Sequence, residues 1–392
     1  MTHKYQVLLI GSFSADRVLL ETSLFKQIDD LGLSRNQVVV IDEKDFGQID
    51  PKSPLVALFF GYHGANDKEH PCLVELARDS IPTIPCVSEV SAVKKTLPES
   101  LYHINVFPLG NPKIEWQRLV TLILENLRLL RSERRLFISY RRMEAQNVAI
   151  QLYEALDQSG FDVFLDTRSV PFAVDFQGIL WHRMADSDVV ILLDTPDFRN
   201  SSWTREELTQ ANATNIQILH ILWPGVKPDN GSAFSEFVTL SGSDFKTLKQ
   251  VGTEARFSDD AVLRTVIRTE SLRARALAAR HRSLVDNFCD QARYHKVKSV
   301  AVQPERFISV ELSAGERVAV VPTIGVPRAD LYQEIEFAIR SSGHITDQIW
   351  LLYDERGLLE KWLSHLDWLN DHLPITALQV SRCSQRLTGG GK

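Results

Sequence analysis

The segment 201–208, SSWTREEL, combines an aromatic ring and a carboxylate at a spacing suited to chemistry. Trp203 and Glu207 are separated by four positions, and residues at i and i+4 face the same side of a helix. Such a pair can hold a ring-bearing substrate beside a negative charge. The segment also fits a capping box, because Thr204 and Glu207 have the T-x-x-E spacing. These eight residues alone favour the cap, so the surrounding sequence has to decide.

The overall composition indicates an ordinary globular chain. It has 392 residues, of which 44% are hydrophobic and 24% charged, and such a length suggests roughly two to four domains. The net charge of -6 argues against a dedicated nucleic-acid binder. The four cysteines lack the spacing of metal ligands and are predicted to be free thiols, so we expect no metal site.

The sequence predicts a cytoplasmic protein. No apolar run approaches the ~20 residues that a membrane-spanning helix needs. The first residues, MTHKYQVLLIGSF, lead directly into a predicted strand and lack the cleavage site of a signal peptide. We therefore expect no membrane partner.

Three blocks of alternating strand and helix patterns divide the chain into predicted domains 1–132, 133–258 and 259–392. Predicted strands of the first block are 5–11, 37–43, 54–62 and 83–88, and those of the second are 135–142, 161–166, 188–194 and 216–223. The third block has a long helix, 260–295, followed by strands 306–312, 316–325, 347–354 and 374–381. Apolar strands separated by helices indicate parallel sheets covered on both faces, and the third block is predicted to be a small Rossmann-like α/β domain.

The second block resembles a TIR (Toll/interleukin-1 receptor) domain. Four motifs in register carry the resemblance: LFISYRR (136–142), FDVFLDTRSVPFAVDFQ (161–177), MADSDVVILLDTPDF (184–198) and SSWTREEL. The resemblance implies a flavodoxin-like fold, with a central parallel sheet wrapped by helices, flanked here by two further Rossmann-like α/β domains.

The family contains two functional classes, and the resemblance leaves both open. Some members, including many bacterial ones, cleave NAD+ at the nicotinamide–ribose bond, and the glutamate of their W-x-x-x-E helix start corresponds to Glu207. The product is ADP-ribose or a cyclic isomer, and such prokaryotic enzymes commonly act in anti-phage defence after oligomerisation. Other members are signalling scaffolds that work through TIR–TIR contacts. A third hypothesis is a transferase or glycosidase that acts on another nucleotide.

The chemistry of NAD+ cleavage explains why a single carboxylate suffices. The leaving nicotinamide is a cationic pyridinium, so it needs no proton, while the ribose C1′ carbon becomes oxocarbenium-like. A carboxylate at the position of Glu207 stabilises that positive charge or attacks the carbon. NAD+ is then the substrate, and no cofactor is expected.

The predicted substrate-binding residues lie mostly at the carboxyl ends of strands, where open α/β sheets bind ligands. They are Ser139, Tyr140, Arg141, Arg142, Asp166, Phe172, Asp194 and Trp203. Arg141 or Arg142 would contact the phosphates. Asp166 would bond ribose hydroxyls or cap its own loop, and Trp203 would stack on a ring or fill the core.

The flanking blocks are predicted to sense a trigger, either a small molecule or a protein, or to build an assembly. In the first block, a possible degenerate copy of the TIR fold, Glu75 corresponds to Glu207 but Pro71 replaces the tryptophan, which predicts an inactive module. In the third block, the arginines of the long helix (Arg264, Arg268, Arg273, Arg275, Arg280 and Arg282) would bind a phosphate-bearing signal or an acidic partner, or form a solvated face beside an acidic neighbour. The loop PTIGVPRAD (322–330) is a ligand site at a helix N-terminus or a plain turn.

Overall fold

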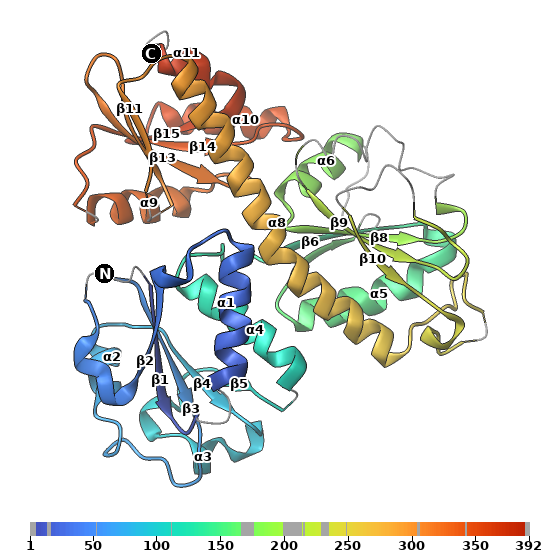
Figure 1. Cartoon of the computed structure of the whole chain (residues 1–392). Coiled ribbons are helices and arrows are strands. Elements are labelled where there is room, and N and C mark those ends of the chain that lie inside the picture. Colours follow the sequence, from blue (N-terminus) through green and yellow to red (C-terminus); the bar gives the residue numbers. More distant parts are fainter. Residues whose placement is uncertain are drawn as a thin grey trace. The chain divides into compact units, whose positions relative to one another are not determined.

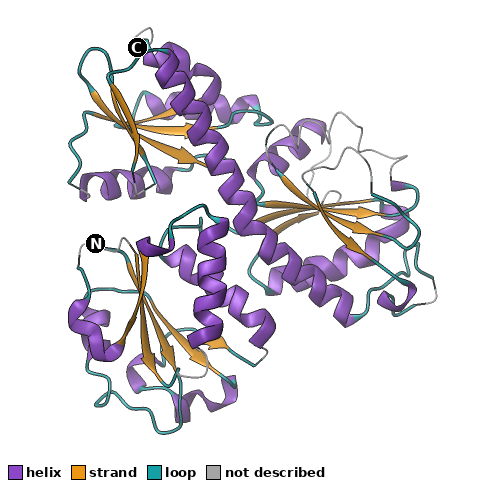
Figure 2. Ribbon diagram, in the orientation of Figure 1, coloured by secondary structure: helices purple, strands orange, loops and turns teal. Residues whose placement is uncertain are grey.

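The structure is a computed structural model with three β-sheets and their covering helices (Figures 1 and 2). It describes residues 5–13, 17–51, 53–110, 112–165, 176–198, 214, 216–228, 235–247, 249–303, 306–341 and 343–388. The chain forms two compact units, Met1–Ser132 and Glu133–Lys392. We keep the division into three domains as a proposal, because each of the three blocks contains its own sheet.

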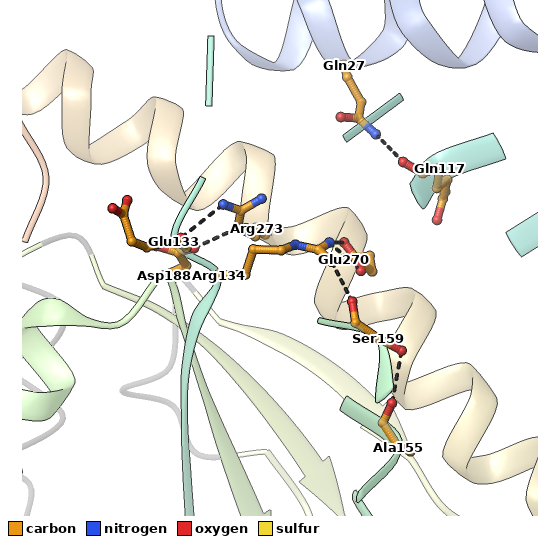
Figure 3. Close-up of polar contacts among 9 residues, drawn as sticks. All are labelled: Gln27, Gln117, Glu133, Arg134, Ala155, Ser159, Asp188, Glu270 and Arg273. Atoms are coloured by element: carbon orange, nitrogen blue, oxygen red, sulfur yellow. Dashed lines mark hydrogen bonds and ion pairs between the residues drawn. The ribbon is translucent and has the colours of Figure 1, made fainter. Parts of the chain in front are cut away.

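The first unit is a five-stranded parallel sheet with helices on its faces. Its strands are β1 (Tyr5–Gly11), β2 (Val38–Asp42), β3 (Leu55–Phe60), β4 (Thr83–Val87) and β5 (Phe107–Pro108), in the order β2-β1-β3-β4-β5. Its helices are α1 (Arg17–Asp30), α2 (Cys72–Arg78), α3 (Val93–Thr96) and α4 (Pro112–Asn126). Every side chain of β3 is buried, as expected for a strand covered on both faces. Helices α1 and α4 pack together, and Gln27 donates to the carbonyl oxygen of Gln117 across them at 3.4 Å (Figure 3).

The central sheet repeats this topology. Its strands are β6 (Arg135–Tyr140), β7 (Asp162–Leu165), β8 (Val189–Asp194), β9 (Gln217–Leu222) and β10 (Glu236–Thr239), all parallel, in the order β10-β9-β8-β6-β7. Counted from the first strand, both sheets have the flavodoxin-like order 2-1-3-4-5. Helix α5 (Arg142–Gln158) connects β6 to β7, and helix α6 (Phe176–Asp186) lies between β7 and β8. The fold class predicted for this block is confirmed.

The third sheet is mixed. It contains β11 (Ser299–Val302), β12 (Ile308–Glu311), β13 (Arg317–Thr323), β14 (Gln348–Tyr353) and β15 (Ile375–Gln379), with helices α9 (Ala329–Ser341), α10 (Glu360–Asn370) and α11 (Cys383–Leu387). Strands β13, β14 and β15 are parallel, whereas β11 and β12 add an antiparallel edge. The α/β class is confirmed, and the antiparallel edge is a feature that the sequence pattern did not predict.

One long helix, α8 (Asp259–Tyr294), belongs to the cores of both the central and the third sheet. Near its start Ala261, Val266 and Leu272 pack in the core of the central sheet. Further along, Leu284 and Phe288 pack against the third sheet. A continuous helix that packs against both sheets explains why these two blocks form a single compact unit.

Buried ion pairs fix α8 to the central sheet (Figure 3). The Arg273 Nε donates to Asp188 Oδ2 at 2.6 Å, and neither side chain is exposed. Arg134, just before β6, pairs with Glu270 of α8. The acidic neighbours predicted for the arginines of this helix are therefore present. The prediction that the arginines form a solvated face is wrong for Arg273 and Arg280, because both side chains are buried.

Among the residues that the structure describes, no helix is both long enough and apolar enough to cross a membrane.

Candidate functional site

The carboxyl ends of β6, β8 and β9 meet at one edge of the central sheet. Ser139 lies beside Leu192 in the strand register, and Asp194 lies beside Leu222. Because side chains alternate along a strand, Ser139 and Asp194 point to the same face of the sheet. Tyr140 points to the opposite face, where its ring belongs to the core that α5 and α8 cover. The predicted residues Ser139 and Asp194 are thus brought together, and Tyr140 is separated from them.

Asp194 forms a buried pair with a histidine that the sequence reasoning missed. The Nδ1 atom of His220 lies 2.7 Å from Asp194 Oδ2, and both side chains are less than a tenth exposed. The imidazole ring stacks on Phe237, with 5.0 Å between the ring centroids. Among the described residues its Nε2 atom has no hydrogen-bond partner. A carboxylate held to one ring nitrogen orients the imidazole and leaves the other nitrogen for a ligand or water.

Arg141 connects the loops that follow β6 and β8. One of its guanidinium nitrogens lies 2.9 Å from Asp197 Oδ2 and 3.0 Å from Glu144 Oε1. The second oxygen of Glu144 is buried without a described hydrogen-bond partner. The backbone of Ala145 departs from helical geometry, so the first turn of α5 is irregular. Arg141 is therefore engaged with carboxylates and holds two loops together.

Arg142 is the better placed of the two arginines for binding an anion. It is exposed and is the first residue of α5. A helix N-terminus carries free backbone N–H groups and a partial positive charge, both of which favour phosphate.

Four predicted site residues, Asp166, Phe172, Trp203 and Glu207, lie outside the described residues. Their roles stay predictions. In the part of the chain that the structure describes, no group of three or more His, Cys, Asp or Glu side chains is placed to hold a metal ion.

The first unit has a second polar cluster at the carboxyl ends of its strands. Nδ1 of His70 lies 2.8 Å from Glu43 Oε2, and its Nε2 lies 2.9 Å from the Tyr62 hydroxyl. That hydroxyl donates to Glu69 at 2.6 Å. Burial, together with Glu69, raises the pKa of Tyr62 to about 12, so the phenol is neutral at ordinary pH. Glu75, the counterpart of Glu207 in the sequence, is exposed on α2 and takes no part in this cluster.

Comparison with known proteins identifies the central domain. Residues 136–251 match the family model described as the TIR domain. This segment of the chain is therefore a TIR domain, as its motifs predicted. The family includes both NAD+-cleaving enzymes and signalling modules, and its members generally associate with one another. Family membership alone thus leaves two classes of function.

More distant comparisons add little. No curated protein matches the sequence. Among solved structures, a putative phosphosugar isomerase from Clostridium difficile 630 is 10% identical, with 71% of this chain and 85% of that chain covered and a TM-score of 0.20. A protein from Vibrio cholerae is 8% identical, with 98% and 96% covered and a TM-score of 0.19. Scores this low support no conclusion about the fold or the function.

Proposed function

We propose that the TIR domain cleaves the nicotinamide–ribose bond of NAD+. The observation that carries the proposal is the family match across 136–251, which includes Trp203 and Glu207 at the W-x-x-x-E spacing. In the sequence, the segment 201–208 comes after β8. The carboxyl end of β8 bears the buried Asp194–His220 pair. The edge that open α/β sheets use for ligands is thus the edge where the polar residues gather.

Four residues are assigned a role in this scheme. The Glu207 carboxylate stabilises the positive charge that develops on the ribose as nicotinamide leaves. Arg142 attracts the phosphates through its charge and the N-terminus of α5. Asp194 bonds a ribose hydroxyl, and His220 is a positioning residue that holds this carboxylate in one orientation. NAD+ is the substrate in this scheme, and the scheme needs no cofactor or metal.

The wider setting of the proposal rests on the resemblance. The enzyme would act in the cytoplasm in prokaryotic anti-phage defence, and it would be activated when TIR domains self-associate. The flanking domains would sense the trigger or build the assembly.

Incubation of the purified full chain with NAD+ tests the proposal. Nicotinamide, ADP-ribose and cyclic isomers are separated by chromatography at several protein concentrations and with a crowding agent, because activity requires assembly. The same incubation with a panel of other nucleotides tests the third hypothesis, because a transferase or glycosidase of different specificity would act on one of them and not on NAD+. The proposal fails if no assembly state releases nicotinamide.

The alternative is a scaffold that works through TIR–TIR contacts, and family membership without the Trp203–Glu207 spacing is compatible with it. It predicts that Glu207→Gln retains function. Changes in the loop after β7, such as Phe172→Ala or Asp175→Ala, would then abolish both self-association and function. Because NAD+ cleavage also requires self-association, Glu207→Gln separates the two hypotheses: it abolishes the function of the enzyme and preserves that of the scaffold, while sedimentation checks that the variant still assembles.

A further inference from the structure

Helix α6 of the TIR domain packs against the third domain within the unit Glu133–Lys392. Its His182 ring stacks on Trp362 of α10, with 5.6 Å between the ring centroids and 13° between the planes. At the end of α6, Asp186 Oδ1 accepts a hydrogen bond at 3.0 Å from the backbone N–H of Val326, in the loop after β13. We propose that this contact is an acid-sensitive switch, in which protonation of His182 releases α6 from the third domain.

The backbone of the third domain also comes close to α6 at Gly357. A Cβ added there would lie 3.3 Å from both the Ala185 Cβ and the Trp181 carbonyl oxygen. The φ of Gly357 is +83°, a conformation that favours glycine. The contact thus combines an aromatic stack, a hydrogen bond and a close backbone approach.

His182 is buried in this contact without its full set of hydrogen bonds. The residue is only 8% exposed. Among the described residues, its Nδ1 atom has no hydrogen-bond partner. A buried polar atom without a partner is less stable than the same atom in water. Opening of the contact therefore relieves a cost that the closed contact carries.

Positive charges surround His182 on the elements packed around it. Arg183 is its neighbour on α6, Lys361 lies on α10 and Arg135 begins β6. Burial, together with these three charges, lowers the pKa of His182 to about 4, so the ring is neutral at ordinary pH. The carboxylate of Asp186 on this side is paired with Arg135. A proton on His182 would thus be held in a buried and mainly positive environment.

The direction of the pH effect follows from these surroundings. In the open contact His182 reaches water, and its pKa returns to the ordinary value of about 6.5. The open state then binds the proton more readily, so falling pH favours opening between about 6.5 and 4. Above about pH 6.5 this group no longer favours opening. From pH 7.5 to pH 5, these two pKa values predict a roughly thirtyfold rise in the opening equilibrium.

The switch acts on the TIR helix that follows the predicted assembly loop. Because α8 packs against both sheets, opening leaves the two domains joined. Helix α6 begins directly after the segment 166–175, which contains Phe172 and Asp175. An effect of opening on TIR self-association rests on the proposed function, whereas the switch itself requires neither NAD+ nor assembly.

Residue-resolved hydrogen exchange of the full chain at pH 7.5 and pH 5 tests the switch. The Val326 amide reports on the contact, because its hydrogen bond crosses it. After correction for the intrinsic pH dependence of exchange, opening at Val326 should rise roughly thirtyfold at pH 5. The amides of the buried strand β8 should show no such rise, which distinguishes local opening from global unfolding.

Two variants reduce the acid response by different means. His182→Phe keeps an aromatic ring beside Trp362 but cannot take up a proton, so its Val326 exchange should not rise at pH 5. Lys361→Glu changes an exposed residue and places a negative charge near the imidazole. It raises the pKa of His182 within the closed contact, so the rise should be at most about half as large.

The matched control is His365→Phe. His365 is an exposed histidine of α10 whose ring centroid lies 6.0 Å from that of Trp362. This variant removes a titratable ring beside the same tryptophan, outside the buried contact. It should respond to acid as the unmodified chain does.

The exchange rates decide between the outcomes. A rise in the unmodified chain and in His365→Phe that is absent from His182→Phe supports the switch. Equal corrected exchange at both pH values in the unmodified chain overturns it, as does a full rise in His182→Phe. If His182→Phe does not fold, an undiminished rise in Lys361→Glu overturns it instead. No NAD+ is present in these measurements, so their result is independent of NAD+ cleavage.

Discussion

The buried Arg273–Asp188 pair offers a quantitative test of how α8 is held to the TIR domain. We consider Arg273→Met, which keeps an unbranched side chain of similar length and removes the charge. The change eliminates the 2.6 Å bond to Asp188 and a 3.2 Å bond to the carbonyl oxygen of Glu133 (Figure 3). It also leaves the Asp188 carboxylate, which is 0% exposed, without its guanidinium partner.

The expected magnitude follows from these contacts. A hydrogen bond to a charged group contributes about 1.5–3 kcal/mol and a neutral one about 0.5–1.5 kcal/mol. Removal of one partner from a buried pair typically costs about 3–5 kcal/mol, because the remaining charge is stranded away from water. We therefore expect Arg273→Met to lower the free energy of unfolding by about 3–5 kcal/mol.

Urea unfolding, followed by circular dichroism and tryptophan fluorescence, provides the measurement. Arg293→Met is the control on the same helix, because Arg293 pairs with Asp290 and both side chains are largely exposed. It should change the free energy by less than about 1 kcal/mol. The double variant Arg273→Met with Asp188→Asn should be less destabilised than the sum of the single changes. A loss at Arg273 no larger than the control, or strict additivity, would refute the reasoning.

Three further predictions concern single residues. His220→Leu leaves the Asp194 carboxylate buried without its partner and should lower the free energy of unfolding by about 3–5 kcal/mol in urea titrations. The pKa of Tyr62 is raised to about 12 in the folded state, so its contribution to stability is present below the unfolded pKa of about 10 and is lost as pH rises toward 12. Tyr62→Phe should flatten this loss in unfolding measurements between pH 9 and about 12. Gly11→Ala should cost more than about 2 kcal/mol, because the new Cβ would lie 2.4 Å from the Phe60 carbonyl oxygen at a φ of +82°.

Each of these predictions has a matched check. Gly47→Ala is the control for Gly11, because among the described residues no atom outside its two chain neighbours lies within 4 Å of its added Cβ, and it should be nearly neutral. Equal effects at the two glycines would contradict the steric argument. An unchanged stability of His220→Leu would show that Asp194 finds another partner. If the free energy of unfolding of Tyr62→Phe falls with rising pH as steeply as that of the unmodified chain, other groups cause the loss of stability at alkaline pH.

Regular elements with strong periodic patterns could be predicted from the sequence. The buried strands β3 and β8 read as continuous apolar runs, and α8 has one predicted helix along nearly its whole length. The short edge strands β5, β10 and β11 were not predicted, since they have two to four residues and weak patterns. Edge strands depend on pairing with a neighbour rather than on their own sequence, which explains the difference.

The candidate site was only partly accessible to sequence reasoning. The motif order identified the TIR domain, and the strand ends indicated Ser139 and Asp194. His220 was missed because its role depends on the register between β8 and β9, which places it beside a carboxylate 26 positions away. A lone histidine inside the apolar run IQILHILW was the available signal. The burial of Arg273 could not be predicted either, because its partner Asp188 lies 85 positions earlier in the sequence.

The most direct test of the central claim compares nicotinamide release by the assembled full chain with that of Glu207→Gln and Glu206→Gln. Both substitutions remove one carboxylate from the same segment, so they separate a catalytic loss from a change in local charge. We predict a loss of about a hundredfold or more in Glu207→Gln and near-normal release in Glu206→Gln. Undiminished release by Glu207→Gln would contradict the account.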